Sequence, residues 1–407
     1  MRVVIVSDFG SVNGGAAKVA IESARGLAEA GVEVVYACAI GPVSDRLDHP
    51  RIEVARFEGE EIWQVGNRIA AARQGVWNAE AHEFLRVLLA RQPRHATLVH
   101  LHQWTKAFSP AAIAAAGASG LPVAITMHDY FSFCPTGGYF DFRAGAACSR
   151  APMSAGCVTA NCDRASYVHK LVRVARQWRS DEAIRSLKAP LFIHVSDFAR
   201  GFAEPFLPKS ARHVLVENMM ETERREPADV AGNSHAVFVG RLTREKGVLV
   251  LAQAAREAGR ALRFVGDGDD EIKAEVCRLN PDAQITGWLA SEEVLAELRA
   301  ARCLVAPSLW YETGPLTVGE AMAQGVPPIV PRTIGAAGRV RDGIDGMVLP
   351  AVEPEALCEA LTALHDDAFA ARLGSAAYQA YWTEPPTLRR HVEALLNSYG
   401  SALAAAA

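Results

Sequence analysis

Short apolar runs recur along the whole chain and alternate with segments of helical period. In the first half we predict strands over 2–9, 32–38, 51–57, 97–103, 122–129, 190–197 and 212–218. In the second half we predict them over 235–242, 261–267, 283–288, 303–308, 327–332 and 346–350. Such runs, apolar on both faces and separated by helices such as the one predicted over 16–30, are typical of a mostly parallel sheet covered on both sides.

The chain divides at a polar stretch without periodicity over 219–234, which we interpret as a linker. We therefore predict an α/β protein with one Rossmann-like domain over 1–218 and a second over 235–380. Ligands of open α/β sheets bind outside the carboxyl ends of the strands. A cleft between the two sets of loops is the expected binding site.

In the segment 381–407, two prolines are followed by a single apolar stripe. Pro385-Pro386 must end the preceding helix. The stripe consists of Leu388, Val392, Leu395, Leu396 and Tyr399, which share one helical face. We predict a C-terminal helix that packs back on the N-terminal domain.

Composition narrows the class of protein. Of the 407 residues, 50% are hydrophobic and 22% are charged, with a formal net charge of −4, which argues against disorder and against nucleic acid as a partner. No apolar run approaches the roughly 20 residues that span a bilayer. Because the first residues also lack the features of a signal peptide, we expect a cytoplasmic protein.

Two carboxylates eight positions apart, Glu312 and Glu320, form the strongest chemical pattern. The break at Gly314-Pro315 predicts a helix from near Leu316, whose free amides would lie beside Glu312 and suit a phosphate. Glu320, about one turn inside, could accept two hydrogen bonds from a vicinal diol such as a ribose. Taken alone, the pair could equally be two solvated glutamates.

A basic loop follows the predicted strand 235–242. Arg241 and Lys246 lie within Gly240–Gly247, where a strand meets a helix and paired cations could neutralise a diphosphate. A solvated basic loop is the alternative.

The first half offers two weaker candidates. Gly14-Gly15 open the first helix and could let the backbone approach a phosphate, although the spacing is not the dinucleotide fingerprint and a plain tight turn fits equally well. His128-Asp129 end a strand, where His128 could contact a sugar hydroxyl or serve as a buried structural histidine.

Together these features resemble glycosyltransferase family 4, the large retaining group with the GT-B fold. The resemblance covers essentially the whole chain and is carried by Gly14-Gly15, His128-Asp129, Asn218, GRLTREKG over 240–247, VGDG over 265–268, the Glu312/Glu320 pair and the C-terminal helix. It implies two Rossmann-like domains, the first on the acceptor side and the second binding the nucleotide-sugar donor.

The resemblance also implies roles for individual residues. Arg241 and Lys246 would hold the donor diphosphate, Glu312 the donor sugar and Glu320 the ribose. The remaining implied contacts are Gly14, Gly15, Gly314, Leu316 and Thr317 with phosphate, His128 with the sugar, and the backbone of Trp288 and Leu289 with the base. Two departures are Gly314-Pro315 in place of Phe-Gly, which removes one amide donor, and Asn218-Met219 in place of Asn-Gly.

The resemblance implies a retaining hexosyl transfer from a UDP- or GDP-sugar to a glycan or lipid-linked acceptor, as in polysaccharide synthesis. Arg241, Lys246 and the helix start would stabilise the leaving diphosphate, and no protein base is assigned. Asp267-Gly268-Asp269 matches the D-x-D pattern that binds a metal in other glycosyltransferases. Because Arg241 and Lys246 would already neutralise the diphosphate, we expect no catalytic metal or other cofactor. The alternatives are a non-catalytic nucleotide-sugar-binding protein and a GT-B-like epimerase.

Two further features leave alternatives open. Four cysteines, Cys134, Cys148, Cys157 and Cys162, could hold a structural zinc, although their spacing lacks paired C-x2-C knuckles and free thiols are the alternative. The segment 164–188 predicts a basic amphipathic helix. It could make peripheral contact with the inner membrane face or could be an ordinary packed helix.

Overall fold

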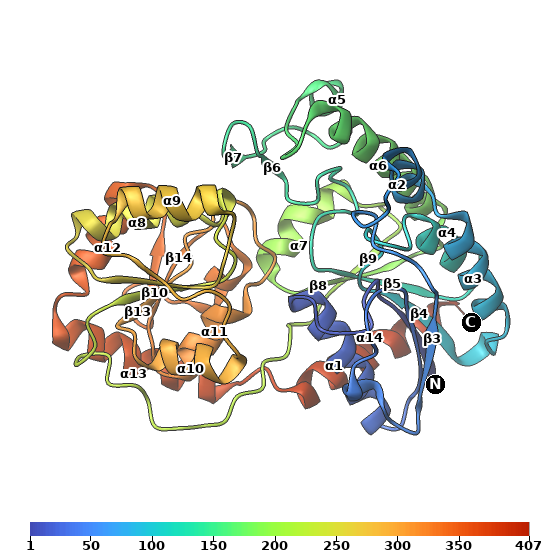
Figure 1. Cartoon of the computed structure of the whole chain (residues 1–407). Helices are drawn as coiled ribbons and strands as arrows, with labels where there is room; N and C mark the ends of the chain where they lie inside the picture. The colour runs from blue at the N-terminus through green and yellow to red at the C-terminus, as the bar shows by residue number, and fades with distance from the viewer. Residues whose placement is uncertain (407) are drawn as a thin grey trace. The chain divides into compact units, whose positions relative to one another are not determined.

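The computed structural model describes residues 1–406, which form two compact α/β units (Figure 1). The first unit contains Met1–Arg143, Cys148–Met219 and the C-terminal segment from Pro386. The second contains Met220–Pro385 and the short stretch Ala144–Ala147. Residues 219–234 form neither helix nor strand.

The first unit is built on a seven-stranded sheet in the order β3-β2-β1-β4-β5-β8-β9, and every neighbouring pair is parallel. The strands are β1 (Arg2–Val6), β2 (Glu33–Cys38), β3 (Ile52–Arg56), β4 (Thr97–Leu101), β5 (Val123–Met127), β8 (Leu191–His194) and β9 (Arg212–Leu215). Each lies inside a predicted apolar run, so the predicted parallel sheet is confirmed. A short hairpin, β6 (Phe140–Asp141) and β7 (Ala146–Ala147), was not predicted.

Helices cover both faces of this sheet. They are α1 (Gly15–Glu29), α2 (Arg68–Val76), α3 (Ala79–Ala90), α4 (Ala111–Ala118), α5 (Ala155–Thr159), α6 (Tyr167–Ser186), α7 (Asp197–Ala203) and α14 (Leu388–Ala406). Short 3-10 turns are η1 (Asp45–Leu47), η2 (Arg94–Ala96) and η3 (Glu204–Phe206). The helix predicted over 16–30 is α1.

The C-terminal helix α14 packs against α1 within the first unit. A Cβ atom on Gly26 of α1 would lie 2.6 Å from Val392 Cγ2 and 2.9 Å from Leu388 Cδ1, so the glycine lets the two helices approach closely. Leu388, Val392, Leu395 and Tyr399 of the predicted stripe are buried. The helix begins just after Pro385-Pro386, where the preceding helix was expected to end.

The second unit repeats the architecture with a six-stranded parallel sheet in the order β12-β11-β10-β13-β14-β15. Its strands are β10 (Ala236–Val239), β11 (Leu262–Val265), β12 (Gln284–Ile285), β13 (Cys303–Val305), β14 (Pro328–Pro331) and β15 (Met347–Leu349). Its helices are α8 (Val248–Glu257), α9 (Asp270–Leu279), α10 (Ser291–Arg299), α11 (Leu316–Ala323), α12 (Pro354–Ala363) and α13 (Asp367–Thr383), with 3-10 turns η4 (Arg244–Lys246) and η5 (Gly335–Arg339).

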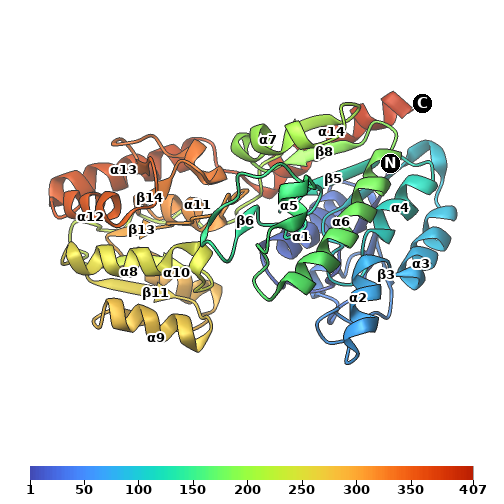
Figure 2. The ribbon, with the colours of Figure 1, turned by 90° about the horizontal axis from the view of Figure 1, so that it is seen from above.

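In the second unit α8, α9 and α12 lie on one face of the sheet and α10, α11 and α13 on the other (Figures 1 and 2). Both sheets are therefore buried on two sides, as the two-sided apolar runs predict. In residues 1–406, no helix has the length and apolar character needed to cross a bilayer.

Candidate functional site

Two glycine-containing loops of the second unit lie against each other at the carboxyl ends of β10 and β11. The Gly240 amide donates to the Val265 carbonyl at 2.9 Å, and the Leu242 amide donates to the Asp267 carbonyl at 2.8 Å. A Cβ atom on Gly266 would lie 2.0 Å from the Gly240 carbonyl oxygen. The loops can approach this closely only because a side chain is missing there.

The loop after β10 ends at Gly247, which adopts φ +72° and opens α8. A Cβ atom on this glycine would lie 1.9 Å from the Pro307 carbonyl oxygen. The Leu309 amide also donates to the Glu245 carbonyl at 2.9 Å. These contacts hold Lys246 next to the segment that follows β13.

Lys246 forms an ion pair with Glu312, whose side chain is 8% exposed. The indole Nε1 of Trp310 donates to the same carboxylate at 3.0 Å. Burial, and then the positive charge of Arg241, lower the pKa of Lys246 to about 8, and Glu245 opposes this shift. Because a carboxylate in direct contact favours the charged amine, Lys246 stays a cation at neutral pH.

Arg241 supplies a second positive charge beside Lys246, since it lowers the pKa of that lysine. Its side chain is exposed, and within residues 1–406 it makes no ion pair. Glu312 and Glu245 lie close to Lys246 and oppose its charge, whereas Arg241 is exposed. The two basic side chains are a pair of neighbouring cations at the strand ends. Such a pair suits an anionic ligand with several oxygens.

The predicted helix start is confirmed, because α11 begins at Leu316 directly after Pro315. The first turn of α11 has no side-chain cap and no acidic side chain. The amides of Leu316 and Thr317 are therefore available to an anion, as amides at helix N-termini commonly are. Glu320, one turn further, is half-buried. Burial raises the pKa of the Tyr381 phenol to about 12, and the nearby charge of Glu320 acts in the same direction.

Trp288 and Leu289 follow β12 in the same unit. The chain turns at Gly287, with φ +76°, and leaves the Trp288 side chain 65% exposed. Leu289 is half-buried and packs on the hydrophobic core. An exposed indole offers a flat apolar surface of the kind that a nucleobase can contact.

Of the two carboxylates of the D-x-D string, that of Asp267 is already paired, whereas that of Asp269 is exposed. Asp267 accepts from the Gly268 amide at 2.8 Å and forms an ion pair with Lys273 at 3.0 Å, and Lys273 also pairs with Asp270 at 2.9 Å. Across the described chain, no group of three or more His, Cys, Asp or Glu side chains is placed to hold a metal ion.

Gly14 and Gly15 lie at the start of α1 in the first unit. Gly14 has φ +117°, and a Cβ atom on either glycine would meet nothing within 4 Å. The space around this helix start is therefore open to an approaching ligand. A plain tight turn would not need such open space.

A buried chain of histidines, which was not predicted from the sequence, reaches His128. His102 Nδ1 lies 3.0 Å from His128 Nε2, and His102 Nε2 lies 3.2 Å from His100 Nδ1. Tyr399 Oη lies 2.6 Å from the same His100 nitrogen, and Thr126 Oγ1 lies 2.7 Å from His100 Nε2. The signal was present, because two histidines two positions apart on one strand share a face.

The imidazoles of His100, His102 and His128 are all neutral. Burial, followed by the nearby His391, lowers the pKa of His128 to about 3. Burial also holds the pKa values of His100 and His102 well below the usual range. Each neutral ring has one donor and one acceptor nitrogen, so the tautomer of His128 is linked to those of the other two.

The clustered cysteines are free thiols, and they do not surround a common metal position. Cys134 contacts Thr136 Oγ1 at 3.4 Å, and Cys148 lies beside Arg150. Cys157 and Cys162 instead share the ammonium of Lys170. The geometry therefore gives the zinc alternative no support.

The predicted basic helix is α6, and it forms one wall of a cavity of about 810 Å³ in the first unit, with α2 opposite. Apolar lining residues are Ile62, Trp63, Val65, Ile69, Val168 and Val172, and basic ones are Arg68, Arg73, His169, Arg173 and Arg176. Several apolar side chains at the cavity are exposed: Trp63 by 55%, Ile69 by 73% and Val168 by 70%.

Arg176 is unusual among the cavity residues because it is 6% exposed. Its Nη2 donates to the Pro135 carbonyl at 2.8 Å, and its guanidinium lies over the Phe131 ring at 4.6 Å. Burial and the neighbouring Arg173 lower its pKa to about 10, so it remains charged. The nearby carboxylates of Asp129 and Asp163 act on this pKa in the opposite direction and partly compensate the buried cation, which can still attract an anionic ligand.

Comparison with known proteins agrees with this architecture. Residues 14–178 match a model described as "Glycosyl transferase 4-like domain", and residues 233–367 match one described as "Glycosyl transferases group 1". Among solved structures, sucrose-phosphate synthase from Thermosynechococcus elongatus superposes with a TM-score of 0.72 at 18% identity, covering 99% of both chains. Anabaena Alr3699/HepE in complex with UDP and glucose gives 0.64 at 16%, covering 98% of this chain and 100% of that one.

These neighbours have the GT-B fold, which confirms the predicted fold class. The chain belongs to glycosyltransferase family 4. A GDP-mannose-dependent alpha-mannosyltransferase of Corynebacterium glutamicum is 34% identical over 157 residues, 38% of this chain and 37% of that protein. A Mycolicibacterium smegmatis protein of the same description is 33% identical over 170 residues, 42% of each chain. The chain thus spans about two fifths of the length of these relatives.

Proposed function

We propose that this protein transfers a sugar from a nucleoside-diphosphate sugar to a glycan or lipid-linked acceptor in glycoconjugate or polysaccharide synthesis. The observation that carries the proposal is the cluster of Lys246, Arg241 and buried Glu312 beside the start of α11. Two cations and a helix N-terminus close together in the chain support the binding of a diphosphate here.

In the proposed reaction the bond between the sugar and the diphosphate breaks, and negative charge develops on the departing phosphate. Lys246, Arg241 and the amides of Leu316 and Thr317 stabilise that charge. Transfer proceeds with retention of configuration, and the departing phosphate oxygen takes the proton of the acceptor hydroxyl, so no protein base is assigned.

The remaining roles belong to the same proposal. Glu312 contacts the donor sugar, Glu320 the ribose, and the backbone at Trp288 the base. Gly314 adds a phosphate contact. Gly14, Gly15 and His128 of the first unit contribute the phosphate and sugar contacts that the family resemblance implies. The donor is a GDP- or UDP-sugar, since curated relatives are described as GDP-mannose-dependent and a structural neighbour binds UDP.

The test is incubation of the purified protein with GDP-mannose, UDP-glucose and related donors, with and without a panel of polyprenyl-phosphate and oligosaccharide acceptors. Sugar transfer to an acceptor with release of the nucleoside diphosphate supports the proposal. A new sugar nucleotide formed from donor alone would instead identify an epimerase. Tight donor binding with no turnover for any acceptor would identify a non-catalytic binding protein.

We predict that transfer does not need a divalent metal, because Lys246 and Arg241 already oppose the diphosphate charge and Asp267 is paired with Lys273. Turnover measured after dialysis against EDTA should stay within about twofold of the untreated rate, since no metal-derived charge is lost. Restoration of a lost rate by Mg²⁺ or Mn²⁺ would contradict this part of the mechanism.

On the acceptor side we propose a lipid-linked acceptor bound at the cytoplasmic membrane face by the cavity between α2 and α6. Its exposed apolar side chains suit a hydrocarbon chain, and buried Arg176 suits the phosphate of a lipid carrier. Basic and apolar groups on one surface are typical of contact with anionic lipid.

We therefore expect the protein to bind vesicles that contain anionic phospholipid, and Val168→Glu to weaken that binding about tenfold by placing a negative charge on the contact surface. Co-sedimentation with vesicles measures the effect. Ile344→Glu is the matched control, because Ile344 is an apolar side chain of the second unit that is 51% exposed. Equal losses in both variants, or no vesicle binding by the unaltered protein, would contradict the proposal.

A further inference from the structure

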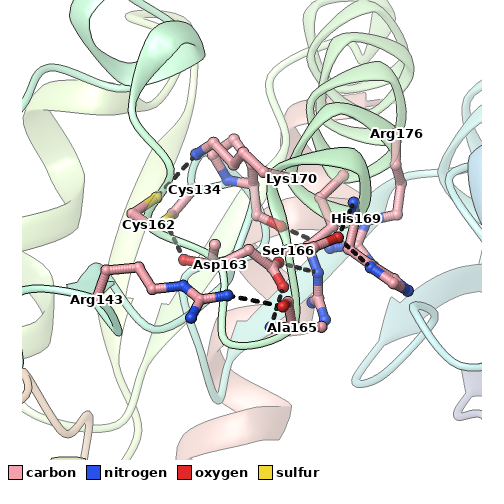
Figure 3. A network of polar contacts seen from close by, with 12 residues as sticks. Cys134, Arg143, Cys162, Asp163, Ala165, Ser166, His169, Lys170 and Arg176 are labelled. Carbon is pink, nitrogen blue, oxygen red and sulfur yellow. Dashed lines mark hydrogen bonds and ion pairs between the residues drawn. The ribbon is translucent and has the colours of Figure 1, made fainter.

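Lys170 is a buried lysine whose polar partners are sulfur atoms. Its side chain, on the first turn of α6, is 1% exposed. Its Nζ lies 3.2 Å from Cys162 Sγ and 3.7 Å from Cys157 Sγ. Figure 3 shows the lysine reaching across to the segment that carries Cys134 and Cys162. Within residues 1–406, Lys170 forms no ion pair with a carboxylate.

In this arrangement the protonation of the amine and that of the thiols affect each other. A buried ammonium is costly unless an opposite charge compensates it, and here only the thiols can supply that charge. Burial raises the pKa of the Cys162 thiol above its ordinary value, and the hydrogen bond and charge of Lys170 offset part of that rise. Burial lowers the pKa of Lys170, but the hydrogen bond with Cys162 and the charges of the nearby thiols together outweigh burial and raise it.

We infer that Cys157 and Cys162 form a redox modification site that peroxide converts to a disulfide, with Lys170 as the charge partner of the reacting thiolate. The thiolate is the form of cysteine that peroxide oxidises, and a neighbouring cation increases its population. Both sulfurs lie on one ammonium group, so a resolving thiol is close to the oxidised one. Cys157 and Cys162 are 7% and 5% exposed, which leaves access for a small oxidant.

The chemistry balances with one hydrogen peroxide molecule. The Cys162 thiolate attacks one peroxide oxygen, breaking the O–O bond to give a sulfenic acid and hydroxide, which takes a proton from Lys170. The Cys157 thiol then attacks the sulfenic sulfur, forming the S–S bond and releasing water as the S–O bond breaks. Two thiols lose one electron each, and peroxide is reduced to two water molecules.

Disulfide formation removes the compensating charge from Lys170. That ammonium connects α6 to the segment 134–163. The ion pair between Arg173 and buried Asp163 at 2.7 Å and the hydrogen bond from Arg176 to the Pro135 carbonyl at 2.8 Å are further connections. Loss of the first connection shifts α6, whose Arg173 and Arg176 line the cavity. The effect on an acceptor rests on the proposed function, whereas the cross-link itself does not.

The experiment exposes the native full-length protein to hydrogen peroxide, blocks the remaining thiols by alkylation and maps the products by peptide mass spectrometry. We expect a Cys157–Cys162 cross-link with loss of two hydrogen atoms, reversed by dithiothreitol. Lys170→Met should slow its formation about tenfold, because removing the cation raises the thiol pKa further and lowers the population of the reacting thiolate. Cys277→Ser, at an exposed cysteine of the second unit, should leave the rate unchanged.

Several outcomes would overturn the inference. One is oxidation of Cys162 without a link to Cys157, and another is a cross-link between Cys162 and Lys170 through an added oxygen atom. A third is one equivalent of zinc in the native protein, which would make the thiolates metal ligands. If Lys170→Met does not fold, the rate of cross-linking in the unaltered protein between pH 6 and pH 9 decides. A rate that does not rise with pH would contradict a reacting thiolate.

Discussion

Replacing Lys246 with alanine should lower the rate of sugar transfer by about 10²–10³-fold, which is the usual cost of removing one preorganised group that stabilises developing charge. Lys246 lies where the loop after β10 meets the segment after β13, and its ammonium contacts the buried carboxylate of Glu312. In the proposed mechanism it is the most buried cation on the leaving diphosphate. The quantity to measure is kcat/KM for the nucleotide sugar at saturating acceptor.

Arg244→Ala is the matched control for this variant. Arg244 lies in the same 3-10 turn, carries the same charge and is exposed, with its nearest carboxylate, Glu271, at 3.5 Å. Its removal should change kcat/KM by less than about twofold, since exposed charges contribute little. A similar loss in both variants would mean that only the general charge of the loop matters.

Removal of Lys246 leaves Glu312 buried without a cation, so loss of activity could reflect local unfolding. The double variant Lys246→Met with Glu312→Gln removes both charges and keeps the shapes of the side chains. We expect it to melt within a few degrees of the unaltered protein, and to remain inactive. A folded and active double variant would exclude the proposed role of this pair.

The parallel sheets could be predicted from the sequence because burial on both faces leaves a distinctive trace. Runs such as 2–9 and 235–242 are apolar at consecutive positions, and the structure places β1 and β10 within them. The start of α11 was also predictable, since Gly314-Pro315 must interrupt the preceding chain. In these places local chemistry alone fixes the element.

The segment between β5 and α6 could not be predicted in the same way. The conformation of this segment depends on contacts with residues distant in sequence. Arg176, for example, donates to the carbonyl of Pro135, which lies 41 residues earlier. A lysine on a basic amphipathic helix is expected to face water, yet Lys170 is buried by thiols that precede the helix. Only the packing of α6 determines which of its basic side chains points inward.

The chain of histidines shows why the candidate site was only partly predictable. His100 belongs to β4, His102 follows directly after that strand, and His128 follows β5, so their contact requires that these two strands be neighbours. Tyr399 joins them from a helix 299 positions further along. Strand order and the docking of α14 are tertiary facts, whereas the apolar runs that predict the strands carry no information about adjacency.

The glycines of the second unit lead to a prediction on stability. Gly247→Ala should lower the free energy of unfolding by more than about 3 kcal/mol, because a backbone clash is among the few changes with effects of that size. The new Cβ would lie 1.9 Å from the Pro307 carbonyl oxygen, so either the loop or the segment after β13 must move. Lys246 is the adjacent residue, and its contact with Glu312 would be displaced as well. Denaturant-induced unfolding measures the loss.

Gly259→Ala separates this contact from the conformational penalty of a left-handed residue. Gly259 has φ +60°, close to the +72° of Gly247, but a Cβ there would meet nothing within 4 Å. It should therefore lose only the roughly 1–2 kcal/mol that an L-residue costs in the left-handed region. The difference between the two variants isolates the close approach of the loop to Pro307. Equal losses would mean that the loop is free to relax, and that the position of Lys246 is not fixed by this contact.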